Sequence, residues 1–167
     1  PDGDMLGYYR KMHLFDANVP PTICFAESDT TKAGSEPVVV ETALGKIGLS
    51  ICYDLRFPEY YAKLVTLGAE IIAVPSAFTM TTGKDHWHPL LRARAIETQS
   101  YVIAPGQYGE HDDNGLRESY GHSMIVDPWG QVVAMVPDGT GVAMAPIDLE
   151  RVRKIRTAMP LTEHRRL

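Results

Sequence analysis

Cys52 is the side chain of this sequence best suited to act as a nucleophile. It follows an apolar segment at residues 47–51 and precedes a turn into a predicted helix. Backbone amides at such a helix start favour a thiolate and can donate hydrogen bonds to a developing oxyanion. We therefore predict oxyanion- or substrate-binding positions at Tyr53 and Asp54, which directly follow the cysteine. The alternative is a buried structural cysteine, and the position of Cys52 in the chain does not by itself decide between the two.

Lys11 is a candidate partner for this cysteine. An ammonium group near a thiol favours the thiolate, and it can also donate a hydrogen bond to a tetrahedral oxyanion. The alternative is a solvated lysine beside the end of a strand.

Five blocks of sequence, taken in order, connect these residues to a known family. They closely resemble the lysine motif, the nucleophile motif and three later motifs of the nitrilase superfamily of carbon–nitrogen hydrolases, in its Nit-type amidase branch. The resemblance extends over essentially the whole chain. It departs from the family at His88, where a glutamate is often found. The blocks are residues 9–16, 52–59, 86–87 with 91–97, 120–123, and 127–130.

The resemblance implies a reaction and three catalytic residues. Cys52 attacks an amide carbonyl, Lys11 and backbone amides hold the oxyanion, ammonia leaves, and water hydrolyses the thioester to a carboxylic acid. Glu27, otherwise a surface charge in a loop, matches by its position a glutamate that positions the substrate and supports the lysine. The implied substrate is a small ω-amide such as deaminated glutathione. The implied assembly is a homo-oligomer such as a dimer.

Two other kinds of function stay open from the sequence. Hydrolysis of an N-carbamoyl group or of a nitrile would use the same superfamily's chemistry. A non-catalytic interaction protein could also retain the fold, although the intact set of Cys52, Lys11 and Glu27 counts against it.

The general base of the family is a glutamate upstream of the lysine motif, and only two aspartates precede Lys11 among the acidic residues here. A thiol that attacks an amide needs a proton acceptor, and the thioester needs a base to activate water. His13 or His122 could form a Cys–His pair instead, but the resemblance makes His13 a structural residue. We therefore expect residues 1–167 to be the C-terminal portion of a single carbon–nitrogen hydrolase domain, inactive alone. The start of the chain inside a Pro-Asp-Gly-Asp turn agrees with this expectation.

The scaffold that must position these side chains is predicted as alternating strands and helices. Loops are predicted at residues 13–35 and 106–119. The order strand–helix–strand–helix–strand, followed by a meander, indicates an α/β protein with helices packed on a mixed sheet. The resemblance implies a four-layer αββα sandwich, here lacking its N-terminal strands and helices. The predicted strands are residues 5–10, 38–42, 46–51, 71–74, 101–104, 123–126, 131–136 and 141–146, and the predicted helices are residues 58–67, 86–99 and 149–156.

The composition of the chain bears on its binding partners and on its location in the cell. The chain of 167 residues has a net charge of −5, and it has no basic stripe that would suit a nucleic acid or an anionic membrane. No apolar run reaches the roughly 18 residues of a membrane span, and the first residues show no secretory signal pattern. Two cysteines provide no disulfide framework, so we expect a cytoplasmic location. No spacing of His, Cys, Asp or Glu indicates a metal, and no cofactor motif is found.

Overall fold

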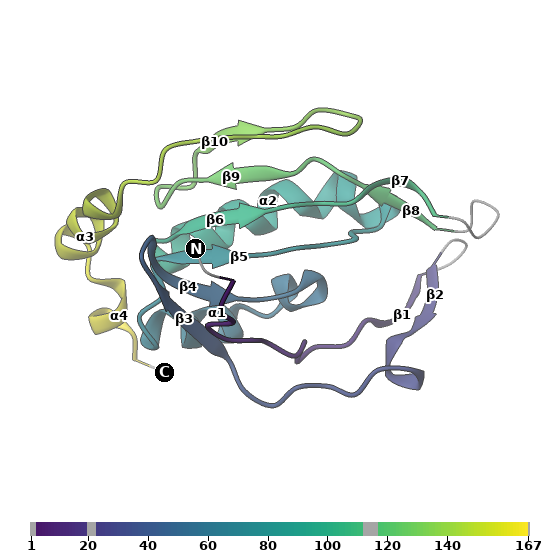
Figure 1. Cartoon of the computed structure of the whole chain (residues 1–167), viewed down its shortest axis with the longest axis horizontal. Coiled ribbons are helices and arrows are strands. Elements are labelled where there is room, and N and C mark those ends of the chain that lie inside the picture. The colour runs from purple at the N-terminus through teal and green to yellow at the C-terminus, as the bar shows by residue number, and fades with distance from the viewer. Residues whose placement is uncertain (1–2, 20–22, 112–116, 167) are drawn as a thin grey trace.

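A six-stranded mixed sheet forms the centre of the protein (Figure 1). The computed structural model describes residues 3–19, 23–111 and 117–166. The three central strands are parallel, and the outer strands run antiparallel to their neighbours. The predicted α/β fold with a mixed sheet is therefore confirmed. In sheet order the strands are β10 (Val132–Met135), β9 (Met124–Val126), β6 (Tyr101–Ala104), β5 (Ile71–Ala73), β4 (Gly45–Leu49) and β3 (Val38–Thr42).

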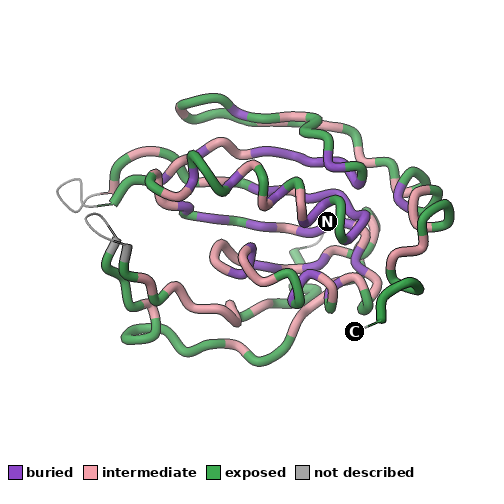
Figure 2. The backbone as a smooth tube through the Cα atoms, turned by 180° about the vertical axis from the view of Figure 1, so that it is seen from behind, coloured by how far each residue is buried: buried purple, intermediate pink, exposed green. Residues whose placement is uncertain are grey.

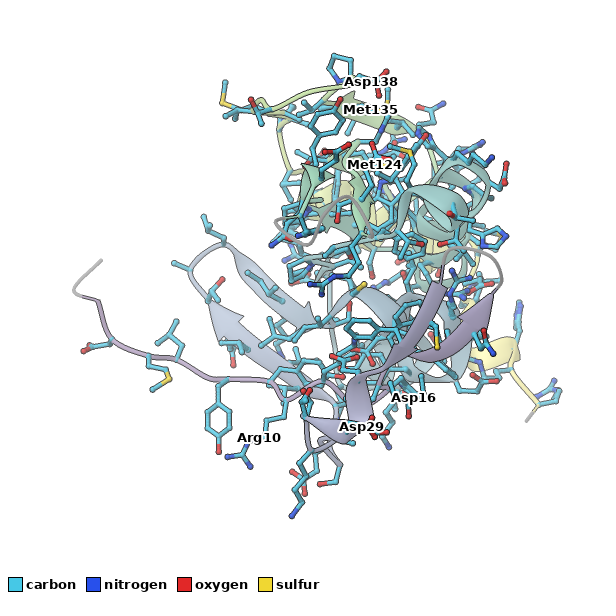
Figure 3. All side chains as sticks on the ribbon, turned by 90° about the vertical axis from the view of Figure 1, so that its right-hand side faces the viewer. Arg10, Asp16, Asp29, Met124, Met135 and Asp138 are labelled. Carbon is cyan, nitrogen blue, oxygen red and sulfur yellow. The ribbon has the colours of Figure 1, made fainter. Side chains whose placement is uncertain are left out.

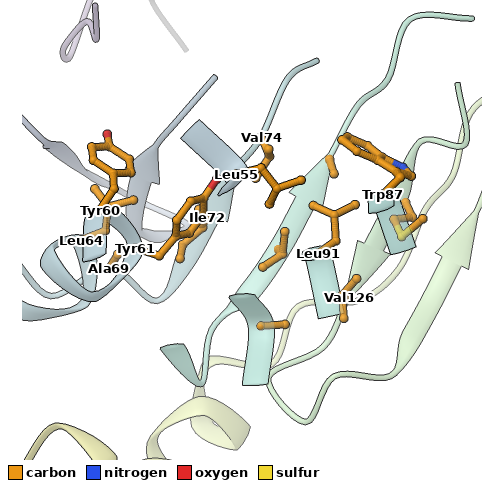
Figure 4. Close-up of a cluster of buried hydrophobic side chains, with 14 of the residues drawn as sticks. Leu55, Tyr60, Tyr61, Leu64, Ala69, Ile72, Val74, Trp87, Leu91 and Val126 are labelled. Atoms are coloured by element: carbon orange, nitrogen blue, oxygen red, sulfur yellow. The ribbon is translucent and has the colours of Figure 1, made fainter. Parts of the chain in front are cut away.

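Helices α1 (Pro58–Thr66) and α2 (Met80–Thr98) cover one face of this sheet. Proline suits the first turn of α1, because its missing N–H would have no helical partner there, and Gly68 follows the helix at φ +95°. In α2, the fully buried side chains of Trp87 and Leu91 point to the sheet (Figure 4). This spacing of four residues is typical of a helix with one apolar face.

The opposite face of the sheet carries a second, smaller core. Ile71 belongs to this core and the next residue, Ile72, to the core under α1 and α2, because successive side chains of a strand point to opposite faces. Helix α3 (Leu149–Ala158) contributes its buried Val152 to the second core, and the short α4 (Leu161–His164) follows it. Figure 2 shows that burial is concentrated along the central strands.

Two hairpins extend at the end of the molecule opposite α3 and α4 (Figure 1). They lie inside the segments predicted as loops, and that part of the prediction is wrong. Proline and polar residues indicated loops. In each segment, however, two stretches of backbone pair with each other as one short antiparallel ladder. The prolines at 20 and 21 and the centre of the second predicted loop lie outside the described residues. The hairpin strands are β1 (Asp16–Val19), β2 (Ile23–Ala26), β7 (Tyr108–Glu110) and β8 (Glu118–Tyr120).

Two predicted strands are absent. Residues 5–10 and 141–146 are extended but pair with no strand in the described part of the chain. Several of their apolar side chains are exposed, with Met5 at 79% and Val142 at 87% exposure. An apolar alternation becomes a strand only when a neighbouring edge is available to it. The remaining predicted elements are confirmed with shifted ends, and α2 begins six residues earlier than the predicted helix.

Candidate active site

Cys52 lies just beyond the carboxyl end of β4, at the start of the 3-10 helix Cys52–Arg56. Its backbone has φ +47°, a left-handed conformation that is uncommon for a residue with a side chain. Its N–H donates to the carbonyl oxygen of Pro75 at 3.0 Å, which ties the turn to the segment after β5. Such strained turns often present a nucleophile at the end of a sheet.

Lys11 and Glu27 form an ion pair next to this turn. The Lys11 Nζ atom lies 2.5 Å from the Glu27 Oε2 atom, and the lysine side chain is only 11% exposed. The preceding Arg10, by contrast, points away from the body of the protein (Figure 3). The same Glu27 oxygen accepts the N–H of Phe15 at 2.6 Å. The carboxylate therefore fixes the ammonium in a single orientation.

Burial and neighbouring groups change the pKa of the Cys52 thiol in opposite directions. Burial raises its pKa, and the nearby Lys11 ammonium lowers it, with burial the larger effect. The backbone amide of Ala77 and the hydroxyl of Ser76 also lower the thiol's pKa by hydrogen bonding. Lys11 therefore favours the thiolate, as expected, but desolvation disfavours the charged form more strongly.

The backbone amide that forms a hydrogen bond with the Cys52 sulfur is neither that of Tyr53 nor that of Asp54. It belongs to Ala77, which follows β5 and lies 25 residues beyond Cys52 along the chain. The amide of Asp54 instead donates to the carbonyl oxygen of Ile51 at 3.1 Å and closes the 3-10 turn. Tyr53 lines the same hollow as Cys52.

A small hollow in front of the cysteine is lined by apolar, hydroxyl and basic side chains. The sequence analysis singled out none of three polar ones, Arg56, Thr79 and Thr82, because no local pattern shows that they face Cys52. The lining residues are Phe15, Cys52, Tyr53, Arg56, Ala77, Phe78, Thr79 and Thr82.

Arg56 contributes a positive charge to this hollow. Its guanidinium lies 5.1 Å from the centre of the Phe78 ring, and its Nη1 atom is 3.2 Å from the Nδ1 atom of His86. Burial lowers the pKa of the guanidinium, although an arginine stays charged in proteins. A guanidinium held in place in this way is suited to bind a planar carboxylate through paired hydrogen bonds.

The two histidines considered as alternative bases have other partners. The Nδ1 atom of His13 lies 2.8 Å from the Asp54 carboxylate, and its ring stacks on Phe57 at 3.8 Å. His122 lies with its Nδ1 atom 2.8 Å from the carbonyl oxygen of Tyr120 and stacks on that ring at 4.0 Å. Both rings are therefore held by structural contacts.

Helix α2 contains an ion pair, with the Arg94 Nη1 atom 2.8 Å from the Glu97 Oε2 atom. The Nε atom of Arg94 also donates to the carbonyl oxygen of Leu55, so the helix supports the 3-10 turn after Cys52. Within the described residues, no cluster of three metal-ligating side chains occurs, and no helix is both long and apolar enough to cross a membrane.

Comparison with known proteins identifies the family to which this chain belongs. The carbon-nitrogen hydrolase family model matches residues 1–157. A Dictyostelium discoideum protein named deaminated glutathione amidase is 49% identical over 168 residues, covering 99% of this chain and 57% of that protein. The chain therefore spans little more than half the length of this relative.

Two solved structures extend the comparison. The crystal structure of the Caenorhabditis elegans NitFhit protein is 48% identical with a TM-score of 0.91, over 99% of this chain and 40% of that one. A mutant amidase from Nesterenkonia sp. AN1 is 26% identical with a TM-score of 0.65, over 79% of this chain and 49% of that one. That amidase carries the acetamide moiety of fluoroacetamide, added covalently at its active-site cysteine. With the family match extending over nearly its whole length, this chain belongs to the carbon–nitrogen hydrolase family.

Proposed function

We propose that the whole protein is an amidase that hydrolyses a small amide to a carboxylic acid and ammonia, with deaminated glutathione as the leading substrate. One observation carries the proposal: the turn that holds Cys52 at φ +47° lies beside a buried Lys11–Glu27 ion pair. The name of the Dictyostelium relative, at 49% identity, supports the choice of substrate.

In the proposed reaction, the Cys52 sulfur attacks the amide carbon as a base takes the thiol proton. The carbonyl oxygen becomes an oxyanion, which accepts a hydrogen bond from the Lys11 ammonium. The carbon–nitrogen bond then breaks, and ammonia leaves with a proton from the protonated base. Water, deprotonated by the same base, attacks the thioester carbon, and cleavage of the carbon–sulfur bond releases the acid and restores the thiol. Glu27 holds Lys11 in place throughout.

The base itself is proposed to come from a part of the whole protein outside residues 1–167, with this chain as the C-terminal portion of one domain. His13 and His122 are engaged elsewhere, which supports this view. We expect residues 1–167 alone to release no ammonia from amides, and addition of the remaining protein to restore turnover. Ammonia release by the isolated chain would contradict the proposal and return His13 and His122 to consideration.

Arg56 is proposed to select amides that also carry a carboxylate, as deaminated glutathione does. Replacing Arg56 with Met should raise KM for such an acidic amide about tenfold or more, because a charge-assisted hydrogen bond is lost. A neutral amide of similar size should be hydrolysed as before, and it serves as the control substrate. An equal loss for both substrates would assign Arg56 a structural role instead.

The decisive test of the amidase proposal compares the two cysteines in the whole protein. Cys52→Ala should abolish ammonia release from deaminated glutathione, and Cys24→Ala should leave it unchanged, since Cys24 is exposed on β2. Mass spectrometry of the wild-type protein quenched during turnover should find an acyl group on Cys52. Nitriles and N-carbamoyl amino acids in the same assay test the neighbouring chemistries of the family. Turnover by the Cys52→Ala variant would refute the proposal.

We also propose that the protein acts as a cytoplasmic homodimer. Two free cysteines support a reducing compartment. Exposed apolar side chains support association, among them Ile96 at 45% and Trp129 at 57% exposure. Light scattering of the purified whole protein should give twice the mass of one chain, and cell fractionation should find it with cytosolic markers. A monomer, or a membrane-bound fraction, would contradict these two points.

A further inference from the structure

Asp54 is a buried carboxylate that the proposed chemistry does not use. Its side chain is fully buried, directly behind the nucleophile turn. A carboxylate in such a place requires several donors to offset the loss of hydration. Its partners therefore show which parts of the chain depend on it.

One set of partners belongs to the nucleophile turn. The Asp54 Oδ2 atom accepts the N–H of Ile51, the residue before Cys52, at 2.8 Å. The Asp54 N–H in turn donates to the Ile51 carbonyl oxygen at 3.1 Å. A non-glycine residue at positive φ persists only when its surroundings fix it, and Cys52 has φ +47°. These two bonds clamp the residue on the N-terminal side of that strained position.

The other set belongs to the segment that carries Lys11. The Asp54 Oδ1 atom accepts the backbone N–H of His13 at 3.1 Å and lies 2.8 Å from its Nδ1 atom. The Oδ2 atom accepts the hydroxyl of Tyr9 at 2.9 Å, and that hydroxyl accepts the N–H of Met12 at 2.9 Å. The residues on both sides of Lys11 are thus held by one carboxylate.

The two side chains that contact Asp54, those of Tyr9 and His13, both donate hydrogen bonds to it. A carboxylate can only accept hydrogen bonds, so the His13 ring donates through Nδ1. Burial raises the pKa of Tyr9, so the phenol keeps its proton and remains a donor. Residues 9–13 have no strand partner in the described part of the chain, so no sheet ladder holds them in place.

We infer that Asp54 is the positioning residue of this site, a single buried carboxylate that fixes the Lys11 segment against the Cys52 turn. It touches neither the substrate nor the reacting atoms, and it acts through the placement of the two catalytic residues. This inference rests on the proposed amidase function for its kinetic consequence, but not for its consequence on the thiol.

The test uses the whole protein and two conservative variants. Asp54→Asn keeps the side-chain shape and removes one acceptor, while Tyr9→Phe removes one hydroxyl without a change of charge. Tyr61→Phe is the matched control. Tyr61 lies in the larger core (Figure 4), and its hydroxyl forms a hydrogen bond with Ser50 rather than with Asp54. The amount of folded protein is measured in each preparation, so that kcat is expressed per folded molecule.

We expect Asp54→Asn and Tyr9→Phe to lower kcat by about 100-fold and about tenfold, respectively, since small misplacements of catalytic groups have effects of this order. KM should change by less than about threefold, because the binding hollow is not altered. In a Lys11→Met background, Asp54→Asn should cause a smaller further loss than in the wild type, since only its clamp on the Cys52 turn is then left to act. Tyr61→Phe should keep its kcat.

A second measurement needs no substrate. The rate at which iodoacetamide labels Cys52, followed against pH, reports the pKa of the thiol. Asp54→Asn and Tyr9→Phe should move this midpoint upward, as Lys11→Met does, and Tyr61→Phe should not. If no amide is hydrolysed, the proposed function fails while this measurement still tests Asp54.

Two results would overturn the inference. One is a loss of stability in both variants with unchanged kcat per folded molecule and unchanged labelling of Cys52. The other is an equal loss of kcat from Asp54→Asn with and without Lys11, which would separate the carboxylate from the lysine. If Asp54→Asn fails to fold, Tyr9→Phe decides the question by the same readouts.

Discussion

At Cys52, burial and a neighbouring cation act in opposite directions on one thiol. Burial raises the thiol's pKa, and the Lys11 ammonium lowers it by a smaller amount. A thiol that stays protonated in the resting protein is a poor nucleophile toward oxidants. In the proposed reaction, it becomes reactive when a base takes its proton, and the Lys11 ammonium then stabilises the oxyanion.

Replacing Lys11 with Met should lower kcat about 100-fold or more, because an oxyanion donor is lost. The pKa of Cys52 should rise at the same time, since removal of a nearby positive charge disfavours the thiolate. Steady-state kinetics and pH-dependent alkylation with iodoacetamide measure the two effects. Lys32→Met, in an exposed part of the same region, should change neither. A Lys11→Met variant with wild-type kcat would assign the oxyanion donor to another group.

Replacing Glu27 with Gln should lower kcat about tenfold or more, because the neutral amide no longer holds the Lys11 ammonium in one orientation. The matched control is Asp29→Asn, which removes a carboxylate from the same 3-10 helix, Glu27–Asp29, at an exposed position. Kinetics on both variants, with circular dichroism as a check on folding, provide the comparison. Equal kcat values for the two variants would show that the ion pair is dispensable.

At the scale of elements, the site depends on the carboxyl ends of parallel strands. Cys52 follows β4, and Ser76 and Ala77 follow β5, so neighbouring strands deliver them to one edge of the sheet. Ligand sites of open α/β sheets form at this edge, where the chain turns away into helices or loops. Helix α2 begins beside the same edge and packs against β8.

The contact between α2 and β8 allows a direct test. Gly83 is buried in α2, and a Cβ atom there would lie 2.4 Å from the Cβ atom of Tyr120. Gly83→Ala should therefore destabilise the protein by about 1–3 kcal/mol, as overpacking does, although alanine is the better helix former. Lys84→Ala, at the exposed neighbouring position, should change the free energy of unfolding by less than about 0.5 kcal/mol. Urea unfolding of both variants measures this, and an equally stable Gly83→Ala variant would contradict the packing described.

At the scale of the whole molecule, a hydrophobic core lies on each face of the sheet, and different helices pack over the two cores. The larger core lies under α1 and α2, and the smaller one is closed by α3 through Val152. Parallel strands are typically buried on both faces, so this second cover is a requirement of the fold.

Val152→Asp should destabilise the protein by about 3 kcal/mol or more, because an unpaired charge would enter the second core. Val142→Asp is the matched control, since Val142 is 87% exposed and an aspartate there stays in water. Thermal unfolding of the two variants should show a large loss of Tm for the first and little change for the second. Similar Tm values would mean that α3 does not close this face.

The sequence by itself determined the local elements that carry strong signals. Pro58 and Gly68 bounded α1, and apolar runs indicated the central strands, because these signals act through a residue's own backbone and its near neighbours. The order of the motifs indicated the family and singled out Cys52, Lys11 and Glu27 before any contact was known.

The tertiary structure alone decided the features that depend on residues far apart in the chain. Residues 5–10 and 141–146 have strand-like patterns but no neighbouring edge in the described part of the chain. The two segments predicted as loops instead form separate hairpins, β1 with β2 and β7 with β8. The sign of the pKa shift at Cys52 depends on how much chain buries it, and no local pattern reports burial. The amide of Ala77, the guanidinium of Arg56 and the carboxylate of Asp54 acquire their surroundings only when the sheet forms. Contacts of this kind are set by packing, which brings distant segments together, and so they lie beyond what local sequence can specify.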